Sequence, residues 1–359
     1  MIIYIFIPIL LLFLTIIKGK GKIYFALFFL FFINVSRDYS VGYDYGTNYK
    51  RLYDQKSAYY YNNIISGDID ASGLLFIDKQ SVEFGWSMIE YIGKINELPF
   101  SFVNFIAAII IFVALTISIR QSPSPIISIL LYVLLFRYYA SFNIIRQSIS
   151  AIIFIVSIPY IIKRQFVKYL ICCLLAASFH LSSLLMLLFY FLPKIRINFN
   201  FSVLLIIAFY VISALNLDMK IFSWLYNSGY MFASYAKYLA IENEYNYNII
   251  FLYIPSILLL VPYLLLNSRF KEARLDVYQL LYVFAIIISI LSIHYEVLFR
   301  FNEYFLNSLI ITFPVLLRKQ NISLYSLKGY MILGCCILYY SMYLFLNANA
   351  IWPYSLIYF

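Results

Sequence analysis

The sequence predicts an all-α, polytopic integral membrane protein, because the chain is too apolar for a soluble fold and its apolar runs have the length of spanning helices. Of the 359 residues, 64% are hydrophobic and only 12% are charged, and the mean hydropathy is +0.87. A globular domain is about half apolar and about a quarter charged. This chain therefore needs lipid to cover its apolar surface, which excludes a soluble enzyme.

Eleven apolar runs follow one another along the chain. Because a spanning helix requires about 20 residues, they predict eleven to twelve transmembrane helices in a single membrane domain, residues 1–359. Two polar stretches are too long to be turns and are predicted to be long loops, residues 36–99 and 218–248. The apolar runs are 2–17, 23–35, 100–119, 126–141, 147–162, 169–192, 199–217, 249–267, 276–293, 298–317 and 329–346.

Basic residues in the short loops orient the chain, since short cytoplasmic loops are rich in Lys and Arg. Lys18, Lys20 and Lys22 lie between the first two runs, which predicts a cytoplasmic loop there and an N-terminus outside. Keeping the later basic turns inside assigns 15 of the 26 Lys and Arg residues to the cytoplasm and both long loops to the outside. With twelve crossings, the C-terminal tail, Asn347–Phe359, is also expected outside. The formal charge of +10 is thus an orientation signal, and no nucleic-acid partner is expected.

Two segments are too short for the crossings that this orientation requires. Residues 169–193 must enter and leave the membrane within about 25 residues, which predicts a short hairpin that turns near Ala177–Ser182. Residues 126–162 are similarly short and turn near Asn143–Gln147. Non-helical backbone at membrane depth is tolerated only where protein or water satisfies it. We therefore expect Asn143–Gln147 and Phe179–Ser182 to form the floor of one cavity open to the outside.

Among the basic side chains within or beside apolar runs, the candidates for function are Arg146, His180 and Arg300. Ionisable groups there are costly and are candidates for function. Two guanidinium groups and an imidazole suit an extracytoplasmic anion such as a lipid-linked pyrophosphate, because guanidinium pairs bidentately with phosphate oxygens. The alternatives are structural: either arginine could extend to the interface, Arg300 could pair with Glu296 or Glu303, and His180 could cap or pack against a helix.

The first long loop combines tyrosines with acidic residues, among them Asp44 and Glu83. Such a segment suits sugars, because aromatic faces stack on sugar C–H surfaces while carboxylates accept hydroxyl hydrogen bonds. A carboxylate that accepts a hydroxyl proton would also serve as a general base. The alternative is a solvated loop whose tyrosines form an interfacial aromatic belt.

Signatures of soluble enzymes are missing from the sequence. There is no Walker loop and no dinucleotide glycine fingerprint, and the two histidines, His180 and His294, are too few for a multi-histidine metal site. We expect no cofactor and no metal. Because the short cytoplasmic loops cannot house a nucleotide-sugar domain, any sugar donor should already be attached to lipid.

Several short motifs, in this order, resemble those of the Wzy/EpsG-type polysaccharide polymerases, which include the O-antigen polymerases. No single motif is specific, but their order extends over most of the chain. They are RDYSVGYDYGTNY (Arg37–Tyr49), EFGW (Glu83–Trp86), FNIIRQ (Phe142–Gln147), FHLS (Phe179–Ser182), RFNEYF (Arg300–Phe305) and WPY (Trp352–Tyr354).

The resemblance implies a GT-C-like glycosyltransferase in a bacterial inner membrane, with its active site facing the periplasm. Such an enzyme moves a growing glycan from undecaprenyl pyrophosphate onto a new undecaprenyl-pyrophosphate-linked repeat unit, as in lipopolysaccharide biosynthesis, within membrane lipid and with a chain-length regulator as a possible partner. Residues implied for pyrophosphate or glycan binding are Arg146, Arg300, Asn143, Gln147, Tyr49 and Tyr304. Candidates for positioning or deprotonating the acceptor hydroxyl are His180, Asp44, Glu83 and Glu303.

Three other functions stay open. A lipid-linked oligosaccharide flippase also handles a polyprenyl pyrophosphate, but it should have short loops on both faces. An O-antigen ligase shares the fold type, although the FNIIRQ and FHLS runs favour the polymerase. A small ion or solute transporter is the third alternative.

Overall fold

Helices make up the regular structure of the protein. The computed structural model describes residues 2–56, 83–227, 249–267 and 275–356. Within these ranges every multi-residue element is helical, and one isolated β-bridge joins Arg37 to Leu356. The predicted all-α fold is confirmed. Of the two predicted long loops, residues 57–82 and 228–248 lie outside the described residues.

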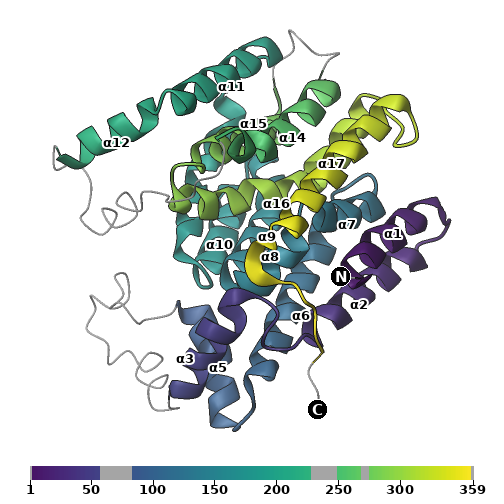
Figure 1. The fold of residues 1–359 in the computed structure, drawn as a ribbon, viewed down its shortest axis with the longest axis vertical. Coiled ribbons are helices and arrows are strands. Elements are labelled where there is room, and N and C mark those ends of the chain that lie inside the picture. The colour runs from purple at the N-terminus through teal and green to yellow at the C-terminus, as the bar shows by residue number, and fades with distance from the viewer. Residues whose placement is uncertain (1, 57–82, 228–248, 268–274, 357–359) are drawn as a thin grey trace. The chain divides into compact units, whose positions relative to one another are not determined.

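The helices group into two compact units, residues 1–190 with 340–359 and residues 191–339. In the first unit, α1 and α2 lie side by side as an antiparallel pair (Figure 1), with the rings of Phe6 and Phe29 6.1 Å apart. The helices of this unit are α1 (Ile2–Ile16), α2 (Gly21–Val35), η1 (Tyr45–Lys50), α3 (Arg51–Gln55), α5 (Phe84–Ile95), α6 (Phe100–Ile119), α7 (Pro125–Leu134), α8 (Arg137–Asn143), α9 (Ile145–Ile162) and α10 (Phe166–Ala177).

Helix α9 forms the core of the first unit, because it packs against both α6 and α10. Apart from Arg146 and Gln147 in its first turn, its side chains are apolar or small around the whole circumference, and most are buried, including Ser148, Ser150 and Ser157. A helix that is apolar all round is expected to be enclosed by other helices. This central position fixes the N-terminal end of α9, where Arg146 lies.

The helix is interrupted between α7 and α8, within a stretch that the sequence predicts to be one continuous apolar run. The chain bends by 55° from α7 to α8, and Phe136 between them has a φ of 65°. A left-handed conformation is unfavourable for a bulky residue, but Phe136 is fully buried against the rings of Tyr139 and Tyr340. Arg137 Nε donates to the carbonyl of Leu135 at 2.8 Å, which satisfies a group that the break leaves free. Tertiary packing thus stabilises a break that the apolar pattern does not reveal.

The two predicted turns are confirmed. Helix α8 ends at Asn143 and α9 begins at Ile145, so the first break lies at Ile144. Helix α10 ends at Ala177 and is followed, after three residues, by η3 (Leu181–Lys194), a 3₁₀ helix.

Helix α10 and η3 form an antiparallel hairpin. The ring of Tyr190 in η3 lies against the rings of Phe166 and Tyr169 in α10, with centroids 5.1 and 5.7 Å away. Ser183 also donates to the carbonyl of Cys173 at 3.3 Å. These contacts place His180 at the turn of the hairpin, as the sequence predicts.

The C-terminal segment packs on the residues that follow α2. Tyr354 donates to the carbonyl of Ile33 at 2.7 Å, and the N–H of Asp38 donates to the carbonyl of Ser355 at 2.8 Å. Tyr340, near the end of α17 (Leu327–Phe345), donates to the carbonyl of Tyr4 at 2.7 Å. The structure thus brings together the N-terminus, the start of the first long loop and the C-terminal tail, which the basic residues assign to one side of the membrane.

The second unit is built around α15, which packs against α11, α14 and α16. Polar side chains tie these helices together: Ser202 and Tyr263 hydroxyls lie 2.6 Å apart, and Gln279 donates to Asn267 at 2.5 Å. Its helices are α11 (Phe199–Ala214), α12 (Leu217–Asn227), α14 (Ile249–Asn267), α15 (Val277–Leu291), α16 (Glu296–Lys319) and most of α17.

Within the described residues, three helices are long and apolar enough to cross a membrane, namely α6, α9 and α17, and the bent pair α7–α8 is a fourth candidate. The shorter apolar helices are α1, α2, α10, η3, α11, residues 253–267 of α14, and α15. These apolar helices are typical of a membrane protein. The count of eleven to twelve crossings and the GT-C-like arrangement stay predictions.

Candidate functional site

Glu83 joins the two predicted turns through its carboxylate. Its Oε2 atom lies 2.5 Å from Nη1 of Arg146, and its Oε1 atom lies 3.2 Å from Nδ1 of His180. The backbone N–H of Leu181 also donates to Oε1, at 3.3 Å. We call Glu83, Arg146 and His180 the Glu83 cluster. The expectation that the turns at Asn143–Gln147 and Phe179–Ser182 lie together is confirmed, whereas an outward-open cavity above them stays a prediction.

Each member of the Glu83 cluster lies at the end of a helix. Glu83 is the residue before α5, and its carbonyl accepts the N–H of Ser87 at 3.0 Å, which begins the helix. Arg146 is the second residue of α9, and His180 lies between α10 and η3. Charged side chains at such breaks contact one another without burying their charge inside a continuous helix.

Gly85 brings the start of α5 against the end of α10. Its N–H donates to the carbonyl of Ser178 at 2.7 Å. A Cβ atom at Gly85 would lie 2.7 Å from the Ser178 hydroxyl and 2.8 Å from the Ser178 carbonyl oxygen. Only glycine permits this approach, which explains its place in the EFGW run and holds Glu83 near His180.

Aromatic rings flank Arg146. Its Cζ atom lies 5.6 Å from the ring centroid of Tyr49, within the range of a cation–π contact. Tyr49 in turn packs against Trp86, whose side chain is almost fully buried, at a centroid distance of 5.3 Å. Tyr49 is therefore part of the environment of the Glu83 cluster, and its role in binding glycan or pyrophosphate stays a prediction.

The pKa of Glu83 falls to about 2, from an ordinary value of 4.5. Burial opposes ionisation of the carboxyl, but the hydrogen bond from His180 and the positive charge of Arg146 outweigh it. Glu83 is therefore ionised at neutral pH and is a weak base. The side chains of Arg146 and His180 keep 29% and 25% of their surface exposed, so both can meet a ligand.

Asp44 lies over the break between α8 and α9. Its N–H donates to Oδ1 of Asn143 at 2.6 Å, and its own Oδ1 accepts a hydrogen bond from Asn48. Gly42 permits this approach: its φ is +102°, and a Cβ atom there would lie 2.8 Å from the carbonyl oxygen of Phe142. Asp44 and Asn143 are thus brought together, while Gln147 is buried within α9.

Arg37 is a structural residue to which the sequence analysis gives no role. The side chain is fully buried and donates to Oδ1 of Asn34 at 2.6 Å and to Oδ1 of Asn104 at 2.9 Å. Its Cζ atom also lies 4.1 Å from the ring centroid of Tyr45 and 4.7 Å from that of Phe142. Arg37 therefore holds the Asp44 segment to α2, α6 and α8. The sequence feature that could have indicated this buried arginine is the presence of two asparagines, Asn34 and Asn104, within apolar runs.

The other predicted site residues lie on α16, in the second unit. Tyr304 is fully buried, and Glu303 is buried with its Oε2 atom 3.3 Å from Nδ2 of Asn307. Arg300 is exposed at the start of this helix. A common site for Arg300 and Arg146 stays a prediction.

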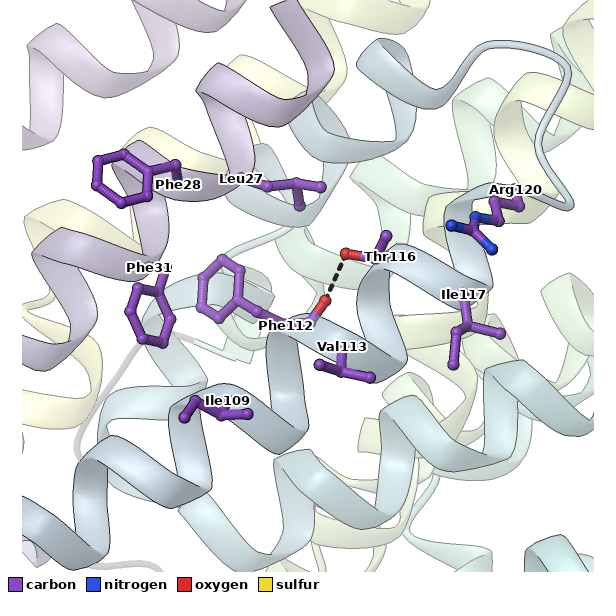
Figure 2. Close-up of a pocket in the computed structure, with 9 residues that line it drawn as sticks. All are labelled: Leu27, Phe28, Phe31, Ile109, Phe112, Val113, Thr116, Ile117 and Arg120. Atoms are coloured by element: carbon purple, nitrogen blue, oxygen red, sulfur yellow. Dashed lines mark hydrogen bonds between the residues drawn. The ribbon is translucent and has the colours of Figure 1, made fainter. Parts of the chain in front are cut away.

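A separate apolar pocket of about 380 Å³ lies between α2 and α6 (Figure 2). The Thr116 hydroxyl is already hydrogen-bonded to the carbonyl of Phe112 at 2.6 Å. Arg120, at one end of the pocket, is therefore the polar side chain of the lining that could contact a ligand. Such a lining fits a hydrocarbon chain better than a sugar. Among the described residues, no group of three or more His, Cys, Asp and Glu could hold a metal ion.

Comparison with known protein families identifies a match over most of the chain. The model of the EpsG family matches residues 21–356, a range that contains the whole Glu83 cluster and all the predicted site residues. No curated protein and no solved structure matches the chain.

Proposed function

The chain belongs to the EpsG family, the Wzy/EpsG-type polysaccharide polymerases, and we propose that it polymerises undecaprenyl-pyrophosphate-linked repeat units at the periplasmic face of a bacterial inner membrane. Family membership and the apolar helices indicate a membrane protein with a polysaccharide polymerase-type function. The lipid-linked donor, the GT-C-like fold and the periplasmic active site belong to the proposal, as do O-antigen or a related surface polysaccharide as the product.

The proposed reaction joins two lipid-linked glycans. A hydroxyl oxygen of the new repeat unit forms a bond to the anomeric carbon of the growing glycan, while the bond from that carbon to the undecaprenyl pyrophosphate breaks. The bonding electrons leave with the pyrophosphate, and the hydroxyl proton passes to a base. The enzyme must therefore stabilise an anionic leaving group and accept one proton.

The Glu83 cluster is the observation that carries the proposal. Arg146 keeps exposed surface although it is fixed by Glu83 and flanked by Tyr49. A guanidinium carries five N–H donors, and the short bond to Glu83 engages Nη1. Nε is buried, so the donors left for pyrophosphate oxygens are those of the terminal Nη nitrogens, a pair with which arginine can bind bidentately. Arg300 would supply a second guanidinium for the same leaving group.

His180 has its Nδ1 atom near Glu83, so its Nε2 atom is the ring nitrogen that can meet a substrate. With Glu83 ionised and Arg146 charged, the Glu83 cluster is neutral when His180 is neutral and carries one positive charge when His180 is protonated. When Nε2 carries a proton, it can donate to a phosphate oxygen. His180 therefore suits phosphate binding, and Glu83 suits positioning of both cations.

The remaining roles are assigned by position and chemistry. Tyr49 would stack on the glycan, and Asn143, Gln147 and Tyr304 would bind glycan or pyrophosphate. Asp44 and Glu303 remain candidates for accepting the hydroxyl proton. A chain-length regulator protein would be the macromolecular partner, with no nucleic acid and no cofactor involved.

Deletion of the gene in a strain that makes a long surface polysaccharide tests the proposal. A polymerase mutant leaves a single repeat unit on the core, a flippase mutant leaves none, and a ligase mutant leaves polymer on the lipid carrier. Only the first outcome supports a polymerase.

Complementation then tests the site. Arg146→Ala should fail to restore long polymer, and Arg51→Ala, at an exposed arginine of α3, should restore it. Both variants must reach wild-type abundance in the membrane. Full-length ladders from Arg146→Ala would overturn the pyrophosphate assignment.

A further inference from the structure

The second unit contains a carboxylate–imidazole pair that the proposed function does not yet use. Asp218, in the first turn of α12, lies 2.8 Å from His294, through Oδ2 and Nδ1. His294 follows α15 and precedes α16, so the pair joins the start of α12 to the turn between these two helices.

Burial makes this contact more than a surface ion pair. The Asp218 side chain is 4% exposed, and that of His294 is 15% exposed. Asp218 Oδ1 is also buried and has no hydrogen-bond partner among the described residues. A buried carboxylate needs donors to offset its desolvation. The imidazole N–H is the donor that the structure provides.

The contact also sets the chemistry of the imidazole. A carboxylate accepts hydrogen bonds, so the proton of neutral His294 resides on Nδ1 and leaves a lone pair on Nε2. Asp218 further stabilises the imidazolium that forms when Nε2 accepts a proton, as in other carboxylate–histidine pairs. Burial, followed by the charge of Asp218, raises the pKa of the neighbouring Tyr295, so this hydroxyl stays neutral.

The two histidines of the chain differ in the partners of their carboxylates. Glu83, beside His180, is also paired with Arg146, whose positive charge opposes a second cation nearby. Asp218 has no arginine or lysine partner in the part of the chain that the structure describes. The carboxylate of Asp218 is therefore not shared with a second cation in that part of the chain.

The position of the pair fits the side of the membrane on which the proposed reaction takes place. Asp218 begins the segment 218–248, which the basic residues of the short loops assign to the outside. His294 lies six residues before Arg300, the expected pyrophosphate ligand.

We propose that His294 is the general base of the polymerase, with Asp218 as its positioning residue. His294 Nε2 takes the proton of the acceptor hydroxyl as that oxygen bonds to the anomeric carbon and the pyrophosphate leaves with the bonding electrons. The imidazolium then releases the proton to water. This inference rests on the proposed polymerase function and assigns the proton-accepting step within it.

The variant His294→Asn separates a catalytic role from a structural one. An asparagine amide can still donate to Asp218, but it has no basic nitrogen in place of Nε2. Purified full-length protein in lipid vesicles is supplied with lipid-pyrophosphate-linked repeat units. We expect kcat to fall by about 100-fold or more with KM little changed, as for loss of a general base. A kcat within about threefold of wild type would overturn the proposal.

Asp218 is tested by a graded pair of substitutions. Asp218→Asn should lower kcat at least about tenfold, and Asp218→Glu should recover part of the loss because it restores the charge. Equal activity of Asp218→Asn and wild type would overturn the positioning role.

Nuclear magnetic resonance of ¹⁵N-histidine-labelled protein gives a readout that does not depend on polymer formation. Because the chain has two histidines, His180→Asn and His294→Asn assign both rings. We expect His294 to carry its proton on Nδ1, and a proton on Nε2 instead would overturn the inference by itself. Wild-type protein that forms no polymer would instead overturn the proposed function, and the role of His294 with it.

Discussion

Glu83 and Arg146 form an ion pair with a separation of 2.5 Å although they lie 63 positions apart in the chain. The pair joins the start of α5 to the start of α9, and the same carboxylate contacts His180 at the turn of the α10–η3 hairpin. One acidic side chain thus fixes two basic side chains that the sequence places in separate apolar runs.

Arg146→Lys should abolish long polymer almost as completely as Arg146→Ala. Lysine keeps the charge but loses the planar fork that binds a carboxylate and a phosphate together. We expect polymer synthesis to fall by about 100-fold, measured with purified protein and lipid-linked repeat units. Near wild-type synthesis by the lysine variant would contradict the prediction, because it would show that a positive charge without the guanidinium fork supports polymer synthesis.

The low pKa of Glu83 makes stability depend on pH. Its folded-state pKa of about 2 is below the ordinary 4.5, so the ionised carboxylate stabilises the fold above about pH 4.5, and this stabilisation is lost as pH falls through about 2. The shift corresponds to about 3 kcal/mol at most.

Thermal unfolding of detergent-solubilised protein at about pH 6 and about pH 3 measures this effect. Glu83→Gln should lower the unfolding temperature at the higher pH and reduce the difference between the two. If the difference in unfolding temperature between the two pH values were the same for Glu83→Gln as for wild type, the prediction would be contradicted.

Gly85→Ala should destabilise the protein and reduce polymer synthesis. The added Cβ atom would lie 2.7 Å from the hydroxyl and 2.8 Å from the carbonyl oxygen of Ser178, and the carbonyl cannot rotate away. We expect a loss of about 1–3 kcal/mol, as for overpacking. Gly334→Ala on α17 is the matched control, because a Cβ there meets nothing within 4 Å. Equal unfolding temperatures for the two variants would contradict the prediction.

Arg37→Ala should lower membrane abundance severely. The substitution leaves Asn34 and Asn104 without their charged donor inside the protein, and it removes the cation from the face of Tyr45. Loss of one member of a buried charged network costs about 3–5 kcal/mol. Arg51→Ala, at an exposed arginine, is the control, and both are quantified by immunoblotting of membranes.

Cysteines at Ser40 and Ser355 should form a disulfide spontaneously in the periplasm. The two Oγ atoms lie 3.0 Å apart, and both residues belong to segments predicted to lie outside. Disulfides persist in the oxidising periplasm but not in the reducing cytoplasm.

Non-reducing electrophoresis of cells that produce Ser40→Cys/Ser355→Cys detects this bond, with each single variant as a control. A bond that forms only after an oxidant is added to lysed cells would confirm the contact and reverse the predicted orientation.

Much of the fold follows from local sequence patterns. Apolar runs predict helices because each run must bury its backbone polar groups within itself. The breaks at Ile144 and around His180 were predictable, since too few residues lie between the basic clusters for full crossings. The break at Phe136 was not, because its left-handed conformation is stabilised by rings from distant parts of the chain, including Tyr340.

The candidate site, like the fold, was only partly predictable from the local sequence. Arg146 and His180 were identifiable because charge within or beside apolar runs is costly and needs a reason. Glu83 was identifiable as an acidic residue of a tyrosine-rich loop and as the first residue of the EFGW motif. Their mutual contacts, the buried position of Arg37 and the pairing of His294 with Asp218 were not identifiable, because nothing local distinguishes these partners from other polar residues.

By itself the sequence determined the fold class, the helical runs, the turns near Asn143 and His180, and the side chains with the chemistry to bind an anion. Each of these depends on hydropathy and charge along a short stretch of chain. Only the tertiary structure decided which carboxylate neutralises which cation. The contact between the start of α5 and the end of α10 determines that choice, through a backbone approach as close as that of Gly85 to Ser178.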